Sequence, residues 1–144
     1  MLPKTDWGHL IPHAGTMCLL DGVLDWDERH IHAISASQAR KDNPLRCAAG
    51  LHAIHLAEYG AQAMAVHGAL LARANGFDTP RPGMLVSLRD VQLAMEYVDT
   101  LSGHLDVHAT CLYADAGGAQ YRFRIEHGGR LLAGGTATVM YSPP

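Results

Sequence analysis

One acidic residue interrupts the most apolar segment of the chain. Between Gly50 and Ala74 the only charged residues are Glu58 and, at the far end, Arg73. A carboxylate among apolar side chains is costly unless it is paired or hydrogen-bonded, and such groups are rarely buried by chance. Glu58 is therefore either part of a structural network that holds this segment against a neighbouring subunit or a functional carboxylate. We favour the functional interpretation, because perturbed acids cluster at active sites.

Polar residues accompany Glu58 at helical spacing. If this segment is a helix, His55 (i−3) and Gln62 (i+4) lie on the same face as Glu58. His52 precedes His55 by three residues, so a metal site has to be considered. The HExxH spacing of helical zinc sites is absent, and no cysteine or further acid completes a tetrahedral set. We therefore predict no metal and no cofactor.

A histidine near the N-terminus is the second candidate for chemistry. His13 follows Ile11 and Pro12 in a segment, residues 1–17, whose prolines and glycine predict a loop. A histidine held in a loop by a rigid scaffold suits acid–base work, since imidazole titrates near neutral pH. A lone loop histidine is more often a surface or packing residue, so the spacing alone leaves both interpretations open.

The pattern of the whole chain predicts the elements that position these residues. Strands are expected at residues 18–25 and 30–37, a loop at 38–49, and one long helix at 50–74. After a turn at residues 80–83, a period of two predicts further strands at residues 84–97, 101–113, 119–127 and 130–141. Small residues along the helix allow a sheet to approach closely. The fold class is therefore α+β, an antiparallel sheet wrapped around one long central helix.

Composition limits what kind of protein this is. The 144 residues, with 48% apolar residues and a net charge of −3, suit a single domain spanning residues 1–144. Lys and Arg do not outnumber Asp and Glu, so we predict no nucleic-acid partner. Polar residues inside residues 50–74 argue against a membrane helix. The three cysteines form no CxxC pair, and the opening residues MLPKTDWGHL lack the apolar run that a signal peptide needs, which predicts a cytoplasmic protein with free thiols.

Two segments resemble the 3-hydroxyacyl-[acyl-carrier-protein] dehydratases, which have the hotdog fold. Ile11-Pro-His-Ala-Gly-Thr-Met-Cys-Leu-Leu-Asp-Gly-Val resembles their PHxxPMxLLDxV segment, and Glu58-Tyr-Gly-Ala-Gln-Ala resembles their ExxAQA helix motif. The chain is most similar to the branch found with bacterial aryl-polyene gene clusters. The resemblance implies dehydration of 3-hydroxyacyl thioesters, an acyl-carrier-protein partner and an apolar acyl tunnel along the helix. It also implies a homodimer, or a higher even oligomer, with the site between subunits.

One motif of these dehydratases is missing from this chain. These dehydratases carry a catalytic histidine in a GHFPxxPxxPG loop before the helix, whereas the corresponding segment here is Asn43-Pro-Leu-Arg-Cys-Ala-Ala-Gly. We therefore expect His13, which matches the PH histidine of the first motif, to be the base, with His52 and His55 in reserve. Glu58, its pKa raised by burial, would be the acid that binds the leaving hydroxyl.

Supporting groups complete the hypothesis. Gln62 would orient Glu58 or the departing water, and free N–H groups at the helix start, near Gly50 and Leu51, would bind the thioester oxygen. Basic residues flank the helix and form either a landing patch for an acidic carrier protein or an ordinary solvated surface: Arg40, Lys41, Arg46, Arg73 and Arg81. The alternatives are a hotdog acyl-thioesterase and a non-catalytic acyl-binding subunit of a heteromeric dehydratase.

Overall fold

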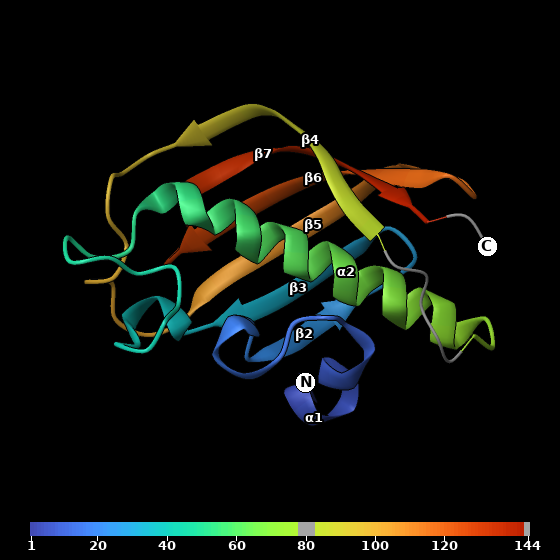
Figure 1. Ribbon diagram of the computed structural model, residues 1–144, viewed down its shortest axis with the longest axis horizontal. Coiled ribbons are helices and arrows are strands. Elements are labelled where there is room, and N and C mark those ends of the chain that lie inside the picture. The colour runs from blue at the N-terminus through green and yellow to red at the C-terminus, as the bar shows by residue number, and fades with distance from the viewer. Residues whose placement is uncertain (78–82, 143–144) are drawn as a thin grey trace.

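The computed structural model describes residues 1–77 and 83–142 of the chain. Within these ranges, seven strands form one antiparallel sheet that curves around one long helix, α2 (Figure 1). The order of the strands is β1-β2-β3-β5-β6-β7-β4. Their bounds are β1 Leu2–Pro3, β2 Gly22–Trp26, β3 His30–Ser35, β4 Gly83–Leu93, β5 Leu105–Ala114, β6 Gly118–His127 and β7 Arg130–Tyr141; the helices are α1 Lys4–Trp7 and α2 Leu56–Ala74. The predicted α+β class, with a sheet wrapped around one central helix, is confirmed.

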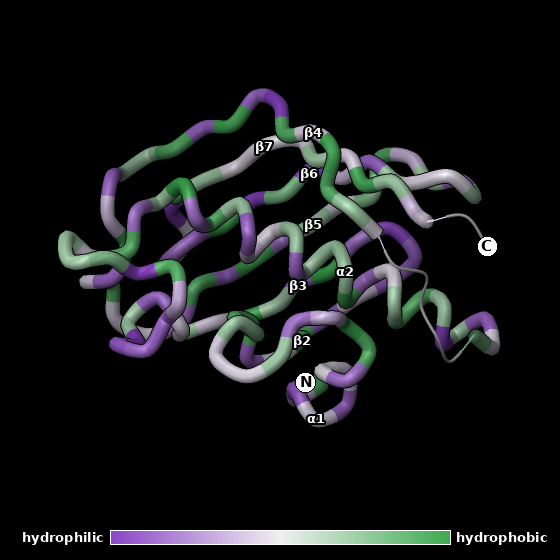
Figure 2. Tube along the Cα trace, in the orientation of Figure 1, coloured by the Kyte–Doolittle hydropathy of each residue, from purple (hydrophilic) through white to green (hydrophobic). Residues whose placement is uncertain are grey.

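Buried and exposed side chains alternate along the strands because α2 covers one face of the sheet. In β6, Tyr121, Phe123 and Ile125 are buried, while Arg122 and Arg124 between them are exposed. Successive side chains of a strand point to opposite faces, so this pattern buries one face and leaves the other in water. Figure 2 shows the same alternation of hydrophobic and hydrophilic residues along β5 and β6.

Small residues bring α2 close to the sheet. A Cβ placed on Gly60 would lie 2.7 Å from Cγ of Phe123, so the helix backbone packs directly on the Phe123 ring. Leu56 and Tyr59, on the same helix, are fully buried. None of the helices in the described part of the chain is long and apolar enough to cross a membrane.

The central helix begins at Leu56, not at residue 50 as predicted. Gly50 has a φ of +123°, which is outside the helical region. The next residue, Leu51, donates its N–H to the Asp99 carboxylate, and His52 forms a bridge with Tyr97. A short 3-10 turn, Ala53–His55, then leads into α2. The helix begins late because residues before Leu56 pair with the segment after β4.

Several strands begin or end at other residues than predicted, and one of them does so because its first residues bond to side chains elsewhere in the chain. The strand predicted at residues 18–25 begins only at Gly22, because the backbone N–H and C=O of Leu19 bond to the side chains of Gln62 and Ser35. The strands predicted at 30–37, 84–97 and 101–113 are observed at His30–Ser35, Gly83–Leu93 and Leu105–Ala114. The last two strands are confirmed to within one residue. Residues 80–82 of the predicted turn lie outside the described residues.

Two glycines of α2 give opposite expectations for substitution by alanine. Gly60→Ala places a methyl group against Phe123, and such overpacking costs about 1–3 kcal/mol, more than the roughly 1 kcal/mol that alanine adds to a helix. Gly68→Ala meets nothing within 4 Å and should stabilise the protein by up to about 1 kcal/mol. Urea unfolding of both variants tests this, and a Gly60→Ala protein at least as stable as Gly68→Ala would contradict the packing.

Candidate active site

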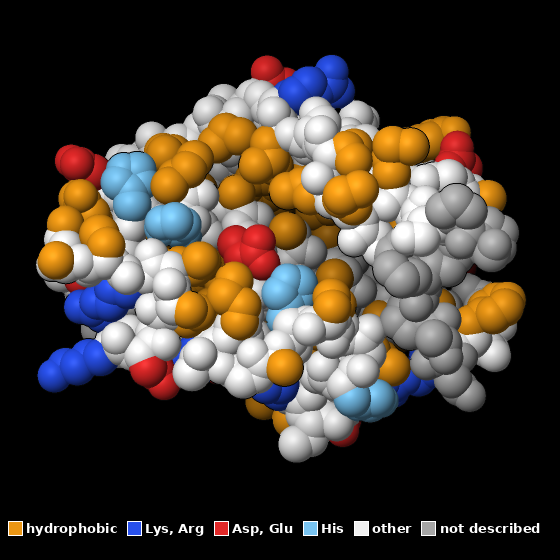
Figure 3. All heavy atoms as spheres, in the orientation of Figure 1, with side chains coloured by type: hydrophobic (Ala, Val, Ile, Leu, Met, Phe, Trp, Pro, Cys, Tyr) orange, Lys and Arg blue, Asp and Glu red, His pale blue; other side chains and the backbone are white. Residues whose placement is uncertain are grey.

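His13 and Glu58 meet at the surface between the N-terminal loop and α2. Nε2 of His13 lies 3.1 Å from Oε1 of Glu58, and the two side chains are 24% and 31% exposed. The loop places His13 between two short 3-10 turns, Gly8–Leu10 and Gly15–Met17. Figure 3 shows that hydrophobic side chains gather on this face of the molecule, over α2 and β4. Residues far apart in the sequence thus form a polar pair in an apolar setting.

The pair fixes the protonation state of Glu58. Its pKa is lowered from the ordinary 4.5, because the hydrogen bond from His13 outweighs the effect of burial, and a second bond comes from Gln62. The raised pKa expected from burial alone is therefore wrong. A carboxylate only accepts hydrogen bonds, so His13 donates through Nε2. Nδ1 of His13 is buried and has no hydrogen-bond partner among the described residues.

Gln62 joins the loop to Glu58. Its Oε1 accepts the N–H of Leu19 at 2.9 Å, while its Nε2 donates to the carbonyl of Met17 at 2.8 Å and to Oε1 of Glu58 at 3.3 Å. The Gln62 side chain is fully buried. Its predicted contact with Glu58 is present, and it also holds the loop that carries His13.

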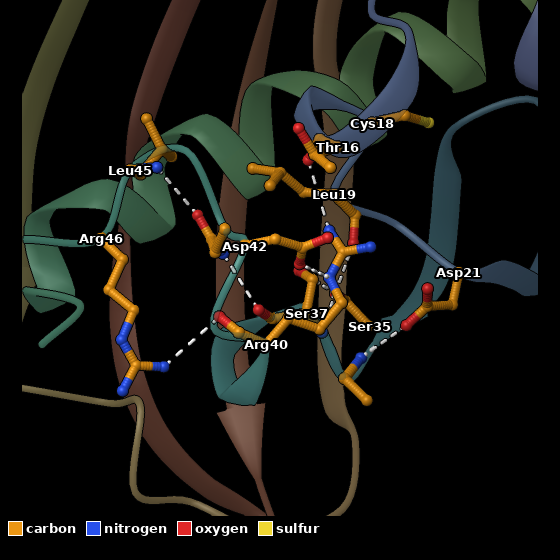
Figure 4. A network of polar contacts seen from close by, with 12 residues as sticks. Thr16, Cys18, Leu19, Asp21, Ser35, Ser37, Arg40, Asp42, Leu45 and Arg46 are labelled. Carbon is orange, nitrogen blue, oxygen red and sulfur yellow. Dashed lines mark hydrogen bonds and ion pairs between the residues drawn. The ribbon is translucent and has the colours of Figure 1, made fainter.

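A second network holds the far side of the same loop. The hydroxyl of Ser35, at the end of β3, donates to the carbonyl of Leu19 and bonds to the hydroxyl of Ser37 (Figure 4). Ser37 bonds in turn to the hydroxyl of Tyr59 on α2, at 2.8 Å. The loop is therefore tied to both the sheet and the helix, which gives His13 a fixed scaffold.

An apolar cavity of about 700 Å³ leads away from the pair. On α2 its lining runs from Glu58 through small residues such as Ala61, Ala65 and Gly68. Leu85 and Val139 of the sheet face them. The helix residues lining it extend to Ala72, so the cavity follows α2 for about 21 Å at 1.5 Å per residue. Its shape suits an extended apolar chain whose polar end lies at His13 and Glu58.

The backbone donors expected at the helix start are already used. The N–H of Gly50 bonds to the carbonyl of Cys47, and the N–H of Leu51 bonds to the carboxylate of Asp99. The N–H of Ala53 donates to the backbone carbonyl of Glu96. The expectation that Gly50 and Leu51 offer free N–H groups is wrong, because this segment is not the first turn of α2.

In the described part of the chain, the reserve histidines form no hydrogen bond or ion pair with Glu58, whose side-chain partners are His13 and Gln62. Nδ1 of His52 accepts the N–H of Ile54, and its ring meets Tyr97 edge-on at 5.4 Å. Neither His52 nor His55 is among the residues that line the cavity. In residues 1–77 and 83–142, no group of three or more His, Cys, Asp or Glu side chains is placed to hold a metal ion. Of the three candidate histidines, the structure brings His13 to Glu58.

Two of the basic residues are tied to their own chain. Arg40 donates to the carbonyl of Thr16 at 3.3 Å (Figure 4). Arg46 donates to the carbonyl of Arg40 and pairs with Asp99 at 3.4 Å. The two arginines therefore lie together. Their bonds also hold the segment that contains Thr16 and the segment that contains Asp99.

The other basic residues do not form one patch with them. Lys41 is exposed beside Arg40. Arg73 bonds to the carbonyl of Asp6 near the C-terminal end of α2, about 22 Å along the helix from Glu58. Arg81 lies outside the described residues. In the described part of the chain, the basic residues therefore do not form one continuous surface for a carrier protein.

Sequence reasoning missed two polar residues near the cavity. Tyr121 of β6 lines the cavity, and its hydroxyl lies 2.6 Å from Nδ1 of the fully buried His67 on α2. The alternation of β6 predicts that Tyr121 faces inward, but nothing in the spacing pairs it with a histidine. Only the packing of α2 on the sheet brings the two together.

The fold and this site define a hotdog protein with an acid–base pair at the mouth of an apolar cavity. Residues 5–144 match the model of the ApeP-like family, described as ApeP dehydratase, so the chain belongs to the ApeP-like dehydratase family. A search of curated proteins finds no match.

Solved structures share the fold. The dehydratase heterocomplex ApeI:P from Xenorhabdus doucetiae has a TM-score of 0.85 at 22% identity, over 99% of this chain and 93% of that one. A hypothetical thioesterase with coenzyme A from Streptococcus pneumoniae has a TM-score of 0.64 at 12% identity, over 96% of each chain. A thioesterase from Staphylococcus aureus has a TM-score of 0.62 at 13% identity, over 85% of this chain and 93% of that one. These neighbours support the hotdog fold.

The hydrogen bond between His13 and Glu58 predicts a measurable change in pKa. In His13→Leu the largest influence that lowers the pKa of Glu58 is lost while burial remains, so this pKa should rise relative to the unmodified protein. The stabilisation that the lowered pKa provides exists above pH 4.5 and is lost as pH falls through that lowered value. Carboxyl ¹³C NMR titration measures the shift. His55→Leu is the control, and an unchanged pKa in His13→Leu would contradict the bond.

Proposed function

We propose that this chain dehydrates 3-hydroxyacyl thioesters, carried on acyl carrier protein, to trans-2-enoyl thioesters in fatty-acid or polyene-type biosynthesis. One observation carries the proposal: His13 bonds to an ionised Glu58 at the mouth of a long apolar cavity. The cavity takes the acyl chain, and the pair lies where the thioester end of that chain would be. Membership of a dehydratase family supports the same reaction.

In the proposed mechanism His13 is both base and acid. With the proton of the imidazole on Nε2, Nδ1 carries the free lone pair. This nitrogen is buried, so the substrate has to displace the residues that cover it before Nδ1 removes the proton from the carbon next to the thioester carbonyl. The electron pair of that C–H bond forms the new double bond, and the bond from the β-carbon to the hydroxyl oxygen breaks. The imidazolium returns its proton to this oxygen, which leaves as water. The ring ends as it began, with Nε2 protonated.

Glu58 acts in this mechanism through His13. Its carboxylate holds the ring in one orientation and stabilises the imidazolium that forms when Nδ1 takes a proton. An ionised Glu58 has no proton to give, so the acid role expected from a buried carboxyl passes to His13. Glu58 is then a positioning residue, and Gln62 positions Glu58.

A thioesterase is the second candidate, and the same ionised carboxylate favours it. A carboxylate that is 31% exposed can hold a water molecule and, with His13, activate it to attack a thioester carbonyl. Two of the neighbouring structures are described as thioesterases. The two reactions differ in product, since a dehydratase forms an enoyl thioester and a thioesterase releases a free thiol.

Paired assays on one preparation separate the candidates. With a 3-hydroxyacyl pantetheine thioester we expect enoyl absorbance, and with a simple acyl thioester no thiol release. His13→Gln and Glu58→Gln should each lower kcat by about 10²–10⁴-fold, because each removes part of the acid–base pair. Glu28→Gln, at an exposed turn, is the matched control. Glu58→Gln should also shift the pH profile of the remaining activity, because His13 loses its anionic partner.

The opposite results assign the other functions. Thiol release without enoyl product would identify a thioesterase. Binding of acyl pantetheine without either product would support the non-catalytic subunit of a heteromeric dehydratase. Unchanged dehydration in Glu58→Gln would overturn the role given to the pair.

A second copy of the chain is proposed to cover β4. This edge strand is exposed along nearly its whole length, and apolar side chains such as Val86, Leu88 and Val91 are 46%, 40% and 36% exposed. Gly83 and Leu85 of the same strand line the cavity. An exposed apolar edge strand has unpaired backbone groups that favour pairing with another strand. Pairing across β4 would bury this surface and close the cavity on that side.

Charged residues on β4 test this pairing. Val86→Lys with Leu88→Lys should convert a dimer to a monomer, measured by light scattering during size-exclusion chromatography, because two charges would enter the shared sheet. Leu24→Lys, on β2 and 42% exposed in the parent, should leave the dimer intact. A parent chain that is monomeric alone and pairs only with a homologous hotdog chain would contradict the homodimer.

The carrier protein is proposed to dock beside Arg40 and Arg46, where Lys41 is exposed. Carrier proteins that present an acidic surface are attracted to such a cluster, mainly at low ionic strength. Lys41→Glu should weaken binding about tenfold or less at low salt and have little effect at high salt. Arg130→Glu, at the exposed first residue of β7, is the control for net charge. Titration by calorimetry at two salt concentrations measures both, and equal affinities for Lys41→Glu and parent would refute the docking site.

A further inference from the structure

Histidines from two neighbouring strands meet on the face of the sheet that α2 does not cover. His30 and His32 alternate with buried residues along β3, and His108 lies between two buried residues of β5. In the antiparallel pairing, His32 lies opposite His108, and His30 is the diagonal neighbour of His108. His30 and His108 line a hollow of about 350 Å³ on this face. None of these residues has a part in the proposed dehydration.

Two imidazole nitrogens of this cluster lie at the separation that one metal ion requires. Nε2 of His30 is 3.2 Å from Nδ1 of His108. Two nitrogens that bind one tetrahedral Zn²⁺ at about 2.0–2.1 Å lie roughly 3.3–3.4 Å apart. The observed and the required separations agree to within about 0.2 Å. A small rotation of the two rings therefore brings both nitrogens to one ion.

The surroundings of His108 leave its Nδ1 with a free lone pair. Nε2 of the same ring faces Oε1 of Glu126 at 3.5 Å, so the carboxylate favours the tautomer that carries its proton on Nε2. Burial lowers the pKa of His108, so the ring is neutral at pH 7. Histidines that bind metals usually donate their other ring N–H to a carboxylate in this way. When no ion is bound, Nε2 of His30 donates to Nδ1 of His108; when an ion is bound, His30 carries that proton on its own Nδ1, so no proton is released.

His32 does not complete a set of three ligands. Its Nε2 lies 2.8 Å from the carboxylate of Asp106, and its ring stacks on His108 with the centroids 4.2 Å apart. Within the described ranges, no group of three such side chains is placed to hold a metal ion. The protein therefore offers two nitrogens, and water molecules in the hollow would complete the coordination of the ion.

The charges around the hollow nearly balance. Arg122 and Arg124 line it and repel a cation, whereas Asp90, which also lines it, attracts one. Nε of Arg124 is paired with Glu126 at 3.0 Å, which offsets part of its repulsion. Binding therefore depends on coordination by imidazole, and imidazole suits Zn²⁺, Cu²⁺ and Ni²⁺, whereas Mg²⁺ prefers carboxylate and water oxygens.

We propose that His30 and His108 bind a divalent transition-metal ion, with Zn²⁺ as the probe, and that this ion joins β3 to β5 on the face of the sheet away from α2. The prediction of no metal rested on the histidines near α2, and this pair lies on the other side of the sheet. The ion holds two strands together and takes no part in turnover. The inference therefore goes beyond the proposed function and does not depend on it.

Calorimetric titration of the full chain with Zn²⁺ tests the proposal. We expect one ion to bind at this pair, no binding of Mg²⁺, and a higher midpoint of thermal unfolding with Zn²⁺, because the ion binds the folded protein. Glu126→Gln should weaken the binding about 10–100-fold, since it removes the carboxylate behind His108. His30→Gln and His108→Gln each remove a ligand and should weaken it further. Circular dichroism establishes that each variant folds.

Imidazole ¹⁵N NMR of the unmodified protein identifies the ligands without any substitution. Zn²⁺ should shift the resonances of Nε2 of His30 and Nδ1 of His108. His104→Gln is the matched control and should bind as the parent does, because His104 is 57% exposed, pairs with Asp106 and does not line the hollow. A parent chain that binds no Zn²⁺, or whose two ring nitrogens do not shift, would overturn the proposal. Binding that survives both His30→Gln and His108→Gln would refute the assignment to this pair.

Discussion

The side-chain amide of Gln62 is the point on which the site depends. It is fully buried and bonds at once to the N–H of Leu19, the carbonyl of Met17 and the carboxylate of Glu58. A buried backbone group without a partner costs about 1–3 kcal/mol, so moving the loop away from Gln62 would destabilise the protein. The loop carries His13, and the helix carries Glu58 one turn from Gln62. One amide therefore sets the distance between the two members of the pair.

The small residues of α2 serve two different purposes on two sides of the helix. On the sheet side, Gly60 lets the ring of Phe123 pack directly on the backbone. On the side that faces the cavity, Ala61, Ala65 and Gly68 leave open space. Larger residues on the first side would force helix and sheet apart, and on the second side they would fill the cavity. The low aromatic and high alanine content of this segment therefore reflects both close packing and an open channel.

The amino-acid sequence alone was sufficient to predict the fold and part of the site. A helix free of proline and four alternating strands require only local patterns, and Glu58 was visible because it is a lone carboxylate among apolar residues. The start of α2 was not predictable, because Leu51 bonds to Asp99, a residue far along the chain. The pKa of Glu58 was also out of reach, since its direction depends on a hydrogen bond from His13, which only the folded loop provides.

The direction of that pKa shift changes how the pair should be understood. A buried carboxyl with no partner would hold its proton and serve as an acid, whereas Glu58, bonded to His13 and Gln62, stays ionised. In the proposed dehydration its charge is most useful when His13 becomes positive, which happens once the ring has taken a proton from the substrate. The interaction then strengthens during the reaction, and this is the condition for lowering a barrier. The exposed side of the pair is Glu58, at the mouth of the cavity, so the shape of the cavity beyond it decides which molecule reaches the pair.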